Sequence, residues 1–170
     1  MEPDAALGIA SQIAVALAGF AGVVTAFRAQ SVHEWEAIDK FRLRLLLTNS
    51  ILPLAYCLFA IALLSIKPVP FHIWRLCSGV SVTINISSMA PLSKRINSLR
   101  QAPSRAAPTN RIAFYFFWVL GALSLLLQLY NAMRLNMFWP FFVGIAVQLV
   151  AAMFQFMLMI LRPSANEEQT

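Results

Sequence analysis

The sequence predicts an all-α membrane protein, a polytopic helical bundle with five transmembrane helices. Two bulk properties indicate this class: 59% of the 170 residues are hydrophobic, and only 12% are charged. A soluble domain has roughly 45–50% apolar and about 25% charged residues. The chain therefore has too little polar surface for an ordinary soluble fold, and the same composition excludes a disordered chain and a coiled coil.

Five apolar segments are the third observation. A helix needs about 20 mostly apolar residues to cross a hydrocarbon core about 30 Å thick. The chain offers five such candidate spans, at 5–27, 45–66, 69–92, 112–133 and 137–161. Too few residues remain outside them for a second folded unit, so we expect one integral membrane domain over 1–170.

Two connections between the spans are very short. Lys67-Pro68 joins the second span to the third, and Arg134-Leu135-Asn136 joins the fourth to the fifth. Short connections make consecutive helices antiparallel neighbours. The predicted arrangement is one helix plus two antiparallel hairpins.

The first span carries a small residue at every fourth position: Ala10, Ala14, Ala18, Gly22 and Ala26. Small side chains let helix backbones approach closely in lipid, where dispersion drives association. The stripe therefore predicts a packing face. We favour packing inside the bundle over a subunit interface.

The approach to the second span has the pattern of an amphipathic helix. Ser31 and Glu34 have the spacing of a capping box, and apolar residues follow at three- and four-residue steps. We expect a helix that begins near Val32, lies at the cytoplasmic interface and can continue into the second span. Pro53 lacks an N–H donor and should kink that span. The connection at 93–111 has five bases and no acid, and is predicted to be flexible.

The third span carries the clearest polar face. Its members step by three, four and three residues, so they lie on one side of a helix: Ser78, Ser81, Asn85 and Ser88. Arg75 precedes them by three residues. One interpretation is the wall of an anion path; the other is a face buried against other helices, with Arg75 reaching outward to the headgroups.

The spans contain amides and hydroxyls but no Asp or Glu. Equal spacing from the two short turns places Asn85 level with Ser50 and beside Asn49, and places Gln155 level with Tyr115. These five residues are expected to form one polar layer in the cytoplasmic half of the membrane. We favour interhelical hydrogen bonding over the lining of a cavity, since amides commonly join membrane helices.

The basic residues indicate the orientation. With five spans, ten of the thirteen bases lie on one side and three on the other, which places the N-terminus outside and the C-terminus in the cytoplasm. If the third span did not cross, the division would be eight to five. We expect a multi-pass protein of the cell membrane, specifically a bacterial inner membrane. The bilayer is its first partner, and anionic headgroups should gather at the basic cytoplasmic loops.

The usual signatures of catalysis and metal binding are absent from the sequence. His33 and His72 fall on opposite sides of the membrane, and Cys57 and Cys77 alone cannot hold a metal. The two cysteines are expected to be reduced and at similar depth. We therefore expect no enzyme activity, no cofactor and no metal. The net charge of +6 is explained by membrane loops, so we expect no nucleic acid partner.

Two functions remain open. The first is a non-enzymatic membrane subunit or scaffold of unknown molecular activity. The second is an oligomeric channel or facilitator for a small solute or an anion, because five helices alone rarely enclose a pore. Either function allows a homo-oligomer or another membrane protein as partner.

Overall fold

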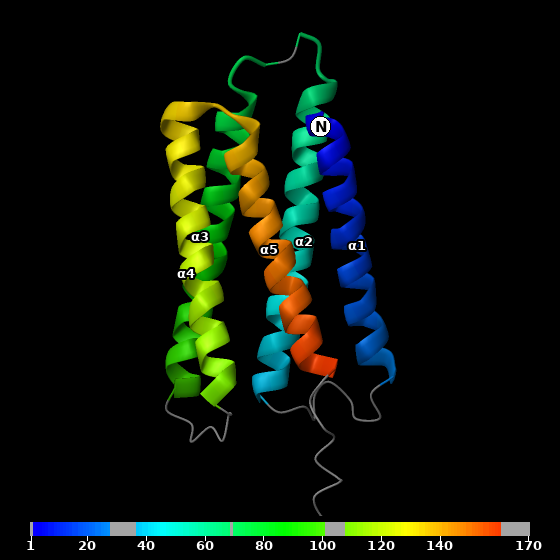
Figure 1. The fold of residues 1–170 in the computed structure, drawn as a ribbon, viewed down its shortest axis with the longest axis vertical. Helices are drawn as coiled ribbons and strands as arrows, with labels where there is room; N and C mark the ends of the chain where they lie inside the picture. Colours follow the sequence, from blue (N-terminus) through cyan, green and yellow to red (C-terminus); the bar gives the residue numbers. More distant parts are fainter. Residues whose placement is uncertain (1, 28–36, 69, 101–107, 161–170) are drawn as a thin grey trace, which may run out of the picture.

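The protein is a bundle of long helices that alternate in direction (Figure 1). The computed structural model describes residues 2–27, 37–68, 70–100 and 108–160. Its elements are α1 (Pro3–Phe27), α2 (Ala37–Ser65), α3 (Ile73–Arg100), α4 (Pro108–Tyr130), the π-helical turn η1 (Asn131–Leu135) and α5 (Phe138–Ile160). The described residues form helices and no strands, so the all-α prediction is confirmed for them.

Four segments of the described chain are long and apolar enough to cross a membrane. They are Pro3–Ala26, Lys40–Ser65, Tyr115–Leu135 and Phe138–Ile160. These helices fit a helical membrane protein. Helix α3 is long but is not among the four, because hydroxyls, Asn85 and several bases interrupt its apolar residues.

The helices extend beyond some predicted boundaries. Helix α2 begins at Ala37, eight residues before the predicted span, and includes Pro53. The proposed capping box at 31–34 lies outside the described residues. The segment 93–111 is not simply a flexible loop, since α3 continues to Arg100 and α4 begins at Pro108. No Gly or Pro interrupts 93–100, and proline is favoured at the first position of a helix.

The two predicted short connections differ from each other. Helix α2 ends at Ser65 and α3 begins at Ile73, so they are farther apart than the expected Lys67-Pro68 turn. Pro68 and Pro70 lack N–H donors, which disfavours the continuation of either helix between these bounds. Between α4 and α5 the chain turns within two residues, Asn136 and Met137, after η1.

The register of the α4–α5 hairpin follows from this tight turn. The rings of Phe117 and Phe154 have centroids 4.8 Å apart. These two residues are equally far in sequence from the midpoint between Leu135 and Asn136. Residues equidistant from the turn thus lie at equal depth, as hairpin geometry requires.

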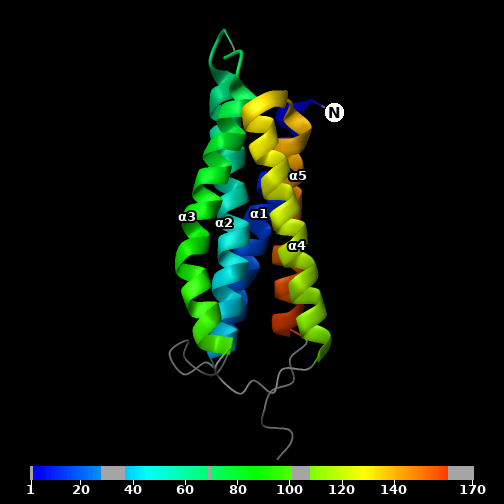
Figure 2. The ribbon, with the colours of Figure 1, turned by 90° about the vertical axis from the view of Figure 1, so that its left-hand side faces the viewer.

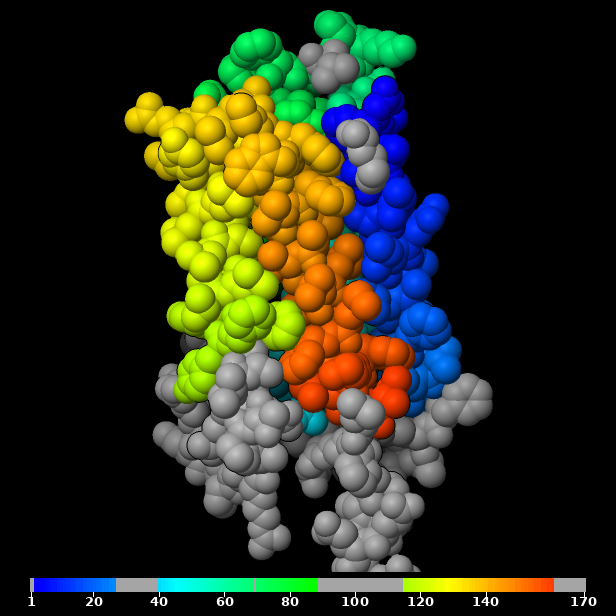
Figure 3. Space-filling model, in the orientation of Figure 1, coloured from blue at the N-terminus to red at the C-terminus, as the bar shows by residue number. Residues whose placement is uncertain are grey.

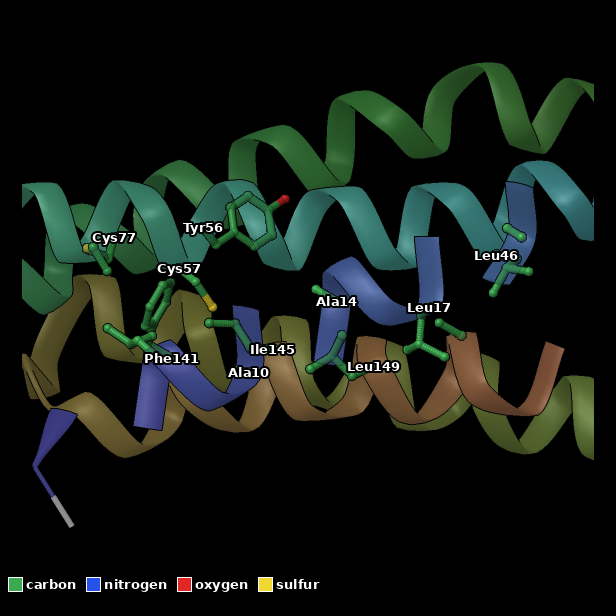
Figure 4. Close-up of a cluster of buried hydrophobic side chains, with 14 of the residues drawn as sticks. Ala10, Ala14, Leu17, Leu46, Tyr56, Cys57, Cys77, Phe141, Ile145 and Leu149 are labelled. Atoms are coloured by element: carbon green, nitrogen blue, oxygen red, sulfur yellow. The ribbon is translucent and has the colours of Figure 1, made fainter. Parts of the chain in front are cut away.

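The hydrophobic core is formed mainly by α1, α2 and α5. Figure 4 shows Ala10, Leu17, Leu46, Ile145 and Leu149 among its side chains. Helix α3 adds its first turns, including Cys77, and no described α4 side chain belongs to this cluster. Figure 1 shows α3 and α4 on the same side of the bundle, and Figure 2, seen from that side, shows α1 behind them.

The small-residue face of α1 divides in two. Ala10 and Ala14 are buried in the bundle, where α1 packs against α2 and α5. Gly22 and Ala26 are exposed, and Ala18 is half-buried. Internal packing therefore accounts for the first half of the predicted face only.

Candidate functional site

A row of polar contacts joins α3 to the α4–α5 hairpin. We call it the polar ladder and define it by three hydrogen-bonded pairs: Ser78 with Asn131, Ser81 with Gln128, and Asn85 with Gln148. The α3 members follow the helical repeat, so all three point to the same side of α3. Their partners come from η1, α4 and α5 in turn.

The first pair is completely buried. Asn131 Nδ2 donates to Ser78 Oγ at 2.7 Å and to the Met137 carbonyl at 2.9 Å. The Met137 N–H donates to Asn131 Oδ1 at 2.9 Å. Asn131 and Ser78 are both 0% exposed. One side chain thus closes the α4–α5 turn and fastens it to α3.

The second pair lies one turn deeper. The hydroxyl of Ser81 lies 2.7 Å from Gln128 Oε1 and 2.9 Å from the Ser78 carbonyl. A hydroxyl has one proton, so Ser81 donates to one of these acceptors at a time. Tyr56 Oη donates to the Ser81 carbonyl at 3.4 Å and ties α2 to the same position.

Gly144 makes room for the second pair. The amide of Gln128 lies directly against the backbone of α5, and a Cβ at position 144 would overlap its Nε2. A glycine is therefore needed on α5 for Gln128 to occupy its buried position. Gln128 is 2% exposed.

The third pair leaves an acceptor unused. Gln148 Nε2 donates to Asn85 Oδ1 at 2.8 Å, while Gln148 Oε1 is buried without a hydrogen-bond partner. The Ser88 hydroxyl donates to the backbone carbonyl of Asn85 at 2.8 Å. Ser88 thus bonds within α3 rather than to a neighbouring helix.

Arg75 and Asn136 form a clamp at the end of the ladder. The Arg75 N–H donates to Asn136 Oδ1 at 3.2 Å, and Asn136 Nδ2 donates to the Phe71 carbonyl at 2.8 Å. Arg75 Nη2 donates to the Arg134 carbonyl at 3.1 Å, while Arg75 Nε is buried without an acceptor. The α4–α5 turn therefore caps the start of α3.

Of the five residues predicted to form one polar layer, Asn49 and Gln155 are bonded to each other, whereas Asn85 and Ser50 bond elsewhere. Asn85 bonds to Gln148 of α5 rather than to Asn49, and the hydroxyl of Ser50 donates to the Leu46 carbonyl of its own helix. Asn49 Nδ2 donates to Gln155 Oε1 at 3.5 Å, which joins α2 to α5. Tyr115 is 55% exposed on α4.

Pro53 is relevant to the Asn49 contact. Proline has no N–H, so the carbonyl of Asn49 lacks its usual helical donor four residues ahead. Asn49 thus has a backbone carbonyl without its helical N–H donor, and its side chain bonds to α5.

Asn136 was not predicted as a site residue. It adopts the left-handed conformation, with φ of 56° and ψ of 43°. Asparagine tolerates this conformation better than most residues and often ends helices. An Asn directly after a helical pattern was therefore the available signal, although its contact with α3 requires the three-dimensional structure.

No group of three His, Cys, Asp or Glu residues that could hold a metal occurs in the described part of the chain. Cys57 and Cys77 are free and buried in the hydrophobic cluster, and Figure 4 shows both in the same half of it. Comparisons with protein families, curated proteins and solved structures find no match.

Proposed function

We propose that the protein is a non-enzymatic subunit or scaffold of a membrane assembly, with five membrane spans. The observation that carries this proposal is the use of its buried polar groups. Ser78, Ser81, Gln128 and Asn131 are all buried and all bonded to one another or to backbone. Polar groups that saturate one another join helices and have little capacity left for a solute.

The arrangement of α3 supports five spans. Helix α3 has 28 residues and runs beside α4 and α2, with which it makes contacts. Ser78, Ser81 and Asn85 of α3 are hydrogen-bonded to the hairpin, and the first two are buried, which reduces the cost of these polar groups in a membrane. With α3 crossing, the ten-to-three division of the bases favours an N-terminus outside and a C-terminus in the cytoplasm.

Helix α4 supplies the surface for an assembly. Large apolar side chains on this helix are exposed, including Phe116, Trp118, Leu123 and Leu126. In the most apolar 18-residue stretch of the span Tyr115–Leu135 only 11% is buried, less than in the matching stretches of the other three spans. Figure 3 shows α4 along one edge of the molecule. Lipid, a second copy or another membrane protein can cover this face.

Reconstitution tests the scaffold proposal. Purified protein in vesicles should give no anion flux with a halide-sensitive dye inside, because the first two pairs of the polar ladder are buried and bonded to each other or to backbone. In the native membrane, mild solubilisation should release the protein in a complex larger than its own 18.9 kDa plus detergent. Substituting Trp118 and Leu126 by Ala should release it from that complex. Monomeric behaviour in the native membrane would contradict the proposal.

A second candidate function is an oligomeric channel or facilitator for a small solute or anion. Arg75 Nε and Gln148 Oε1 favour it, because both are buried polar atoms without a partner and lie beyond opposite ends of the saturated pairs. A passing solute could use both groups. This function requires flux in purified protein, and that flux should fall in Arg75→Gln and in Gln148→Leu but not in Arg134→Gln.

A further inference from the structure

A groove on the outer side of α3 has the dimensions and chemistry of a lipid site. We call it the α3 groove. His72 and Arg75 lie at its mouth, Gly79, Val80 and Ile84 follow along its wall, and Ala132 of η1 contributes from the hairpin. Its surface is mainly apolar below the two basic side chains. From this geometry we propose that the α3 groove binds a phospholipid by its phosphate and one acyl chain.

The length of the groove fits one leaflet. Arg75 and Ile84 are nine residues apart, which corresponds to about 14 Å at 1.5 Å per residue. Half of a hydrocarbon core is about 15 Å. Arg75 lies near the start of α3, at the end of the bundle that holds the α4–α5 turn. An acyl chain along α3 would therefore end near the middle of the membrane.

The basic side chains at the mouth fit the phosphate. A guanidinium has five N–H donors, and that of Arg75 donates one hydrogen bond, to the Arg134 carbonyl. No ion pair joins Arg75 to a carboxylate within the described ranges, so its charge is not neutralised by them. His72 is exposed beside it and adds a second donor. A phosphate would supply the missing negative charge and acceptors.

Gly79 keeps the groove open. A Cβ built at this position meets no atom within 4 Å, so nothing in the bundle requires a glycine there. A larger residue would fill the groove without displacing protein. This proposal rests on the proposed crossing of α3, since the groove must lie in the hydrocarbon layer.

Photolabelling of the full chain tests the site. The probe is a phosphatidylglycerol with a diazirine on one acyl chain, present as a minor component of phosphatidylcholine vesicles. After illumination, mass spectrometry should find labels concentrated on 76–84, above the level on the exposed α1 residues Ile9 and Ile13. Gly79→Leu and Arg75→Gln should each reduce labelling of the groove by about five-fold, the loss expected for a contact of this kind. The matched control is Gly22→Leu, which adds the same side chain at another open glycine and should leave groove labelling unchanged.

Four results would overturn the proposal. The first is equal labelling of the groove and the α1 face; the second is undiminished labelling in Gly79→Leu. The third is loss of labelling with excess inorganic phosphate, which would indicate a free-anion site. The fourth is cross-linking of this α3 segment to a second copy. Labelling of Ile86, which is 55% exposed on α3, distinguishes failure of the lipid site from failure of the proposed crossing of α3. If neither Ile86 nor the groove is labelled, the crossing of α3 is refuted. If Ile86 and the groove are labelled equally, only the lipid site is refuted.

Discussion

At the scale of single residues, the bundle uses neutral amides where many membrane proteins use charges. An unpaired amide costs several kcal/mol in hydrocarbon, whereas a completed interhelical hydrogen bond contributes only about 0.6 kcal/mol on average. The cost of losing a partner is therefore larger than the gain from having one. Asn131 illustrates this, because its three hydrogen bonds reach the turn and α3 together.

Gly144→Ala is expected to destabilise the protein through Gln128. The added Cβ overlaps the buried amide, so Gln128 must move and lose its contact with Ser81. Overpacking of this kind costs about 1–3 kcal/mol. Thermal unfolding in detergent can be followed with a thiol-reactive dye, because Cys57 and Cys77 are buried in the folded protein.

Two further variants make this test specific. Gly121→Ala, in the same hairpin, places its Cβ in open space and should leave the unfolding temperature nearly unchanged. In a Gln128→Ala background, Gly144→Ala should cost much less, because the overlapping amide is gone. An equal cost in both backgrounds would show that Gln128 is not the cause.

At the scale of helices, α4 is held differently from the rest. The hydrophobic cluster contains side chains from α1, α2, α3 and α5, but none from the described part of α4. Helix α4 instead contributes Gln128 and the aromatic contact of Phe117 with Phe154, and continues into Asn131 of η1. Its attachment to α3 thus depends on directed hydrogen bonds, which specify the position of the hairpin.

The turn between α4 and α5 offers a test at this scale. Asn136→Gly should lose the two clamp hydrogen bonds, at a cost of about 1–3 kcal/mol, while keeping a residue that accepts positive φ. Asn136→Ala should be less stable still, by about 1–2 kcal/mol, because alanine disfavours the left-handed conformation. The dye assay used for Gly144 measures both. Equal unfolding temperatures for the two variants would rule out backbone conformation as a reason for asparagine at this position.

The faces of the helices were predictable from sequence, and their partners were not. The three- and four-residue steps of Ser78, Ser81 and Asn85 were sufficient to place them on one side of α3. Pairing Asn85 with Asn49 assumed that α3 faces its sequence neighbour α2. In the structure the hydrogen bond of Asn85 is to Gln148 of α5.

The ends of elements were also only partly predictable. The bases at 94, 95 and 100 suggested a loop, yet lysine and arginine are good helix formers and α3 continues through them. The turn residue Asn136 could be recognised as a helix terminator, but its bonds to Phe71 and Arg75 depend on how two hairpins dock. Such contacts are tertiary and leave no periodic pattern in the sequence.

At the scale of the whole molecule, charge differs between the two ends of the bundle. Lys67, Arg75 and Arg134 lie toward the end that holds the α2–α3 connection and the α4–α5 turn, together with the acids Glu2 and Asp4. The start of α2 and the end of α3 lie at the opposite end and are rich in bases. By the positive-inside rule, we propose that the base-rich end faces the cytoplasm.

Cysteine labelling tests the orientation and the number of spans together. In a Cys57→Ala, Cys77→Ala background, single cysteines are placed at Glu2, Phe71 and Ser104. Phe71 is 85% exposed, and Ser104 lies outside the described residues. With five spans and the N-terminus outside, an impermeant maleimide should label positions 2 and 71 in intact cells, and position 104 only after permeabilisation.

The pattern separates the alternatives because each crossing reverses the side. If α3 does not cross, positions 71 and 104 share a side and should be labelled together. If the whole orientation is reversed, only position 104 reacts in intact cells. The unsubstituted background controls for labelling elsewhere. Labelling of 104 in intact cells would therefore contradict the proposed arrangement, and the reaction at 71 would show whether α3 or the overall orientation is at fault.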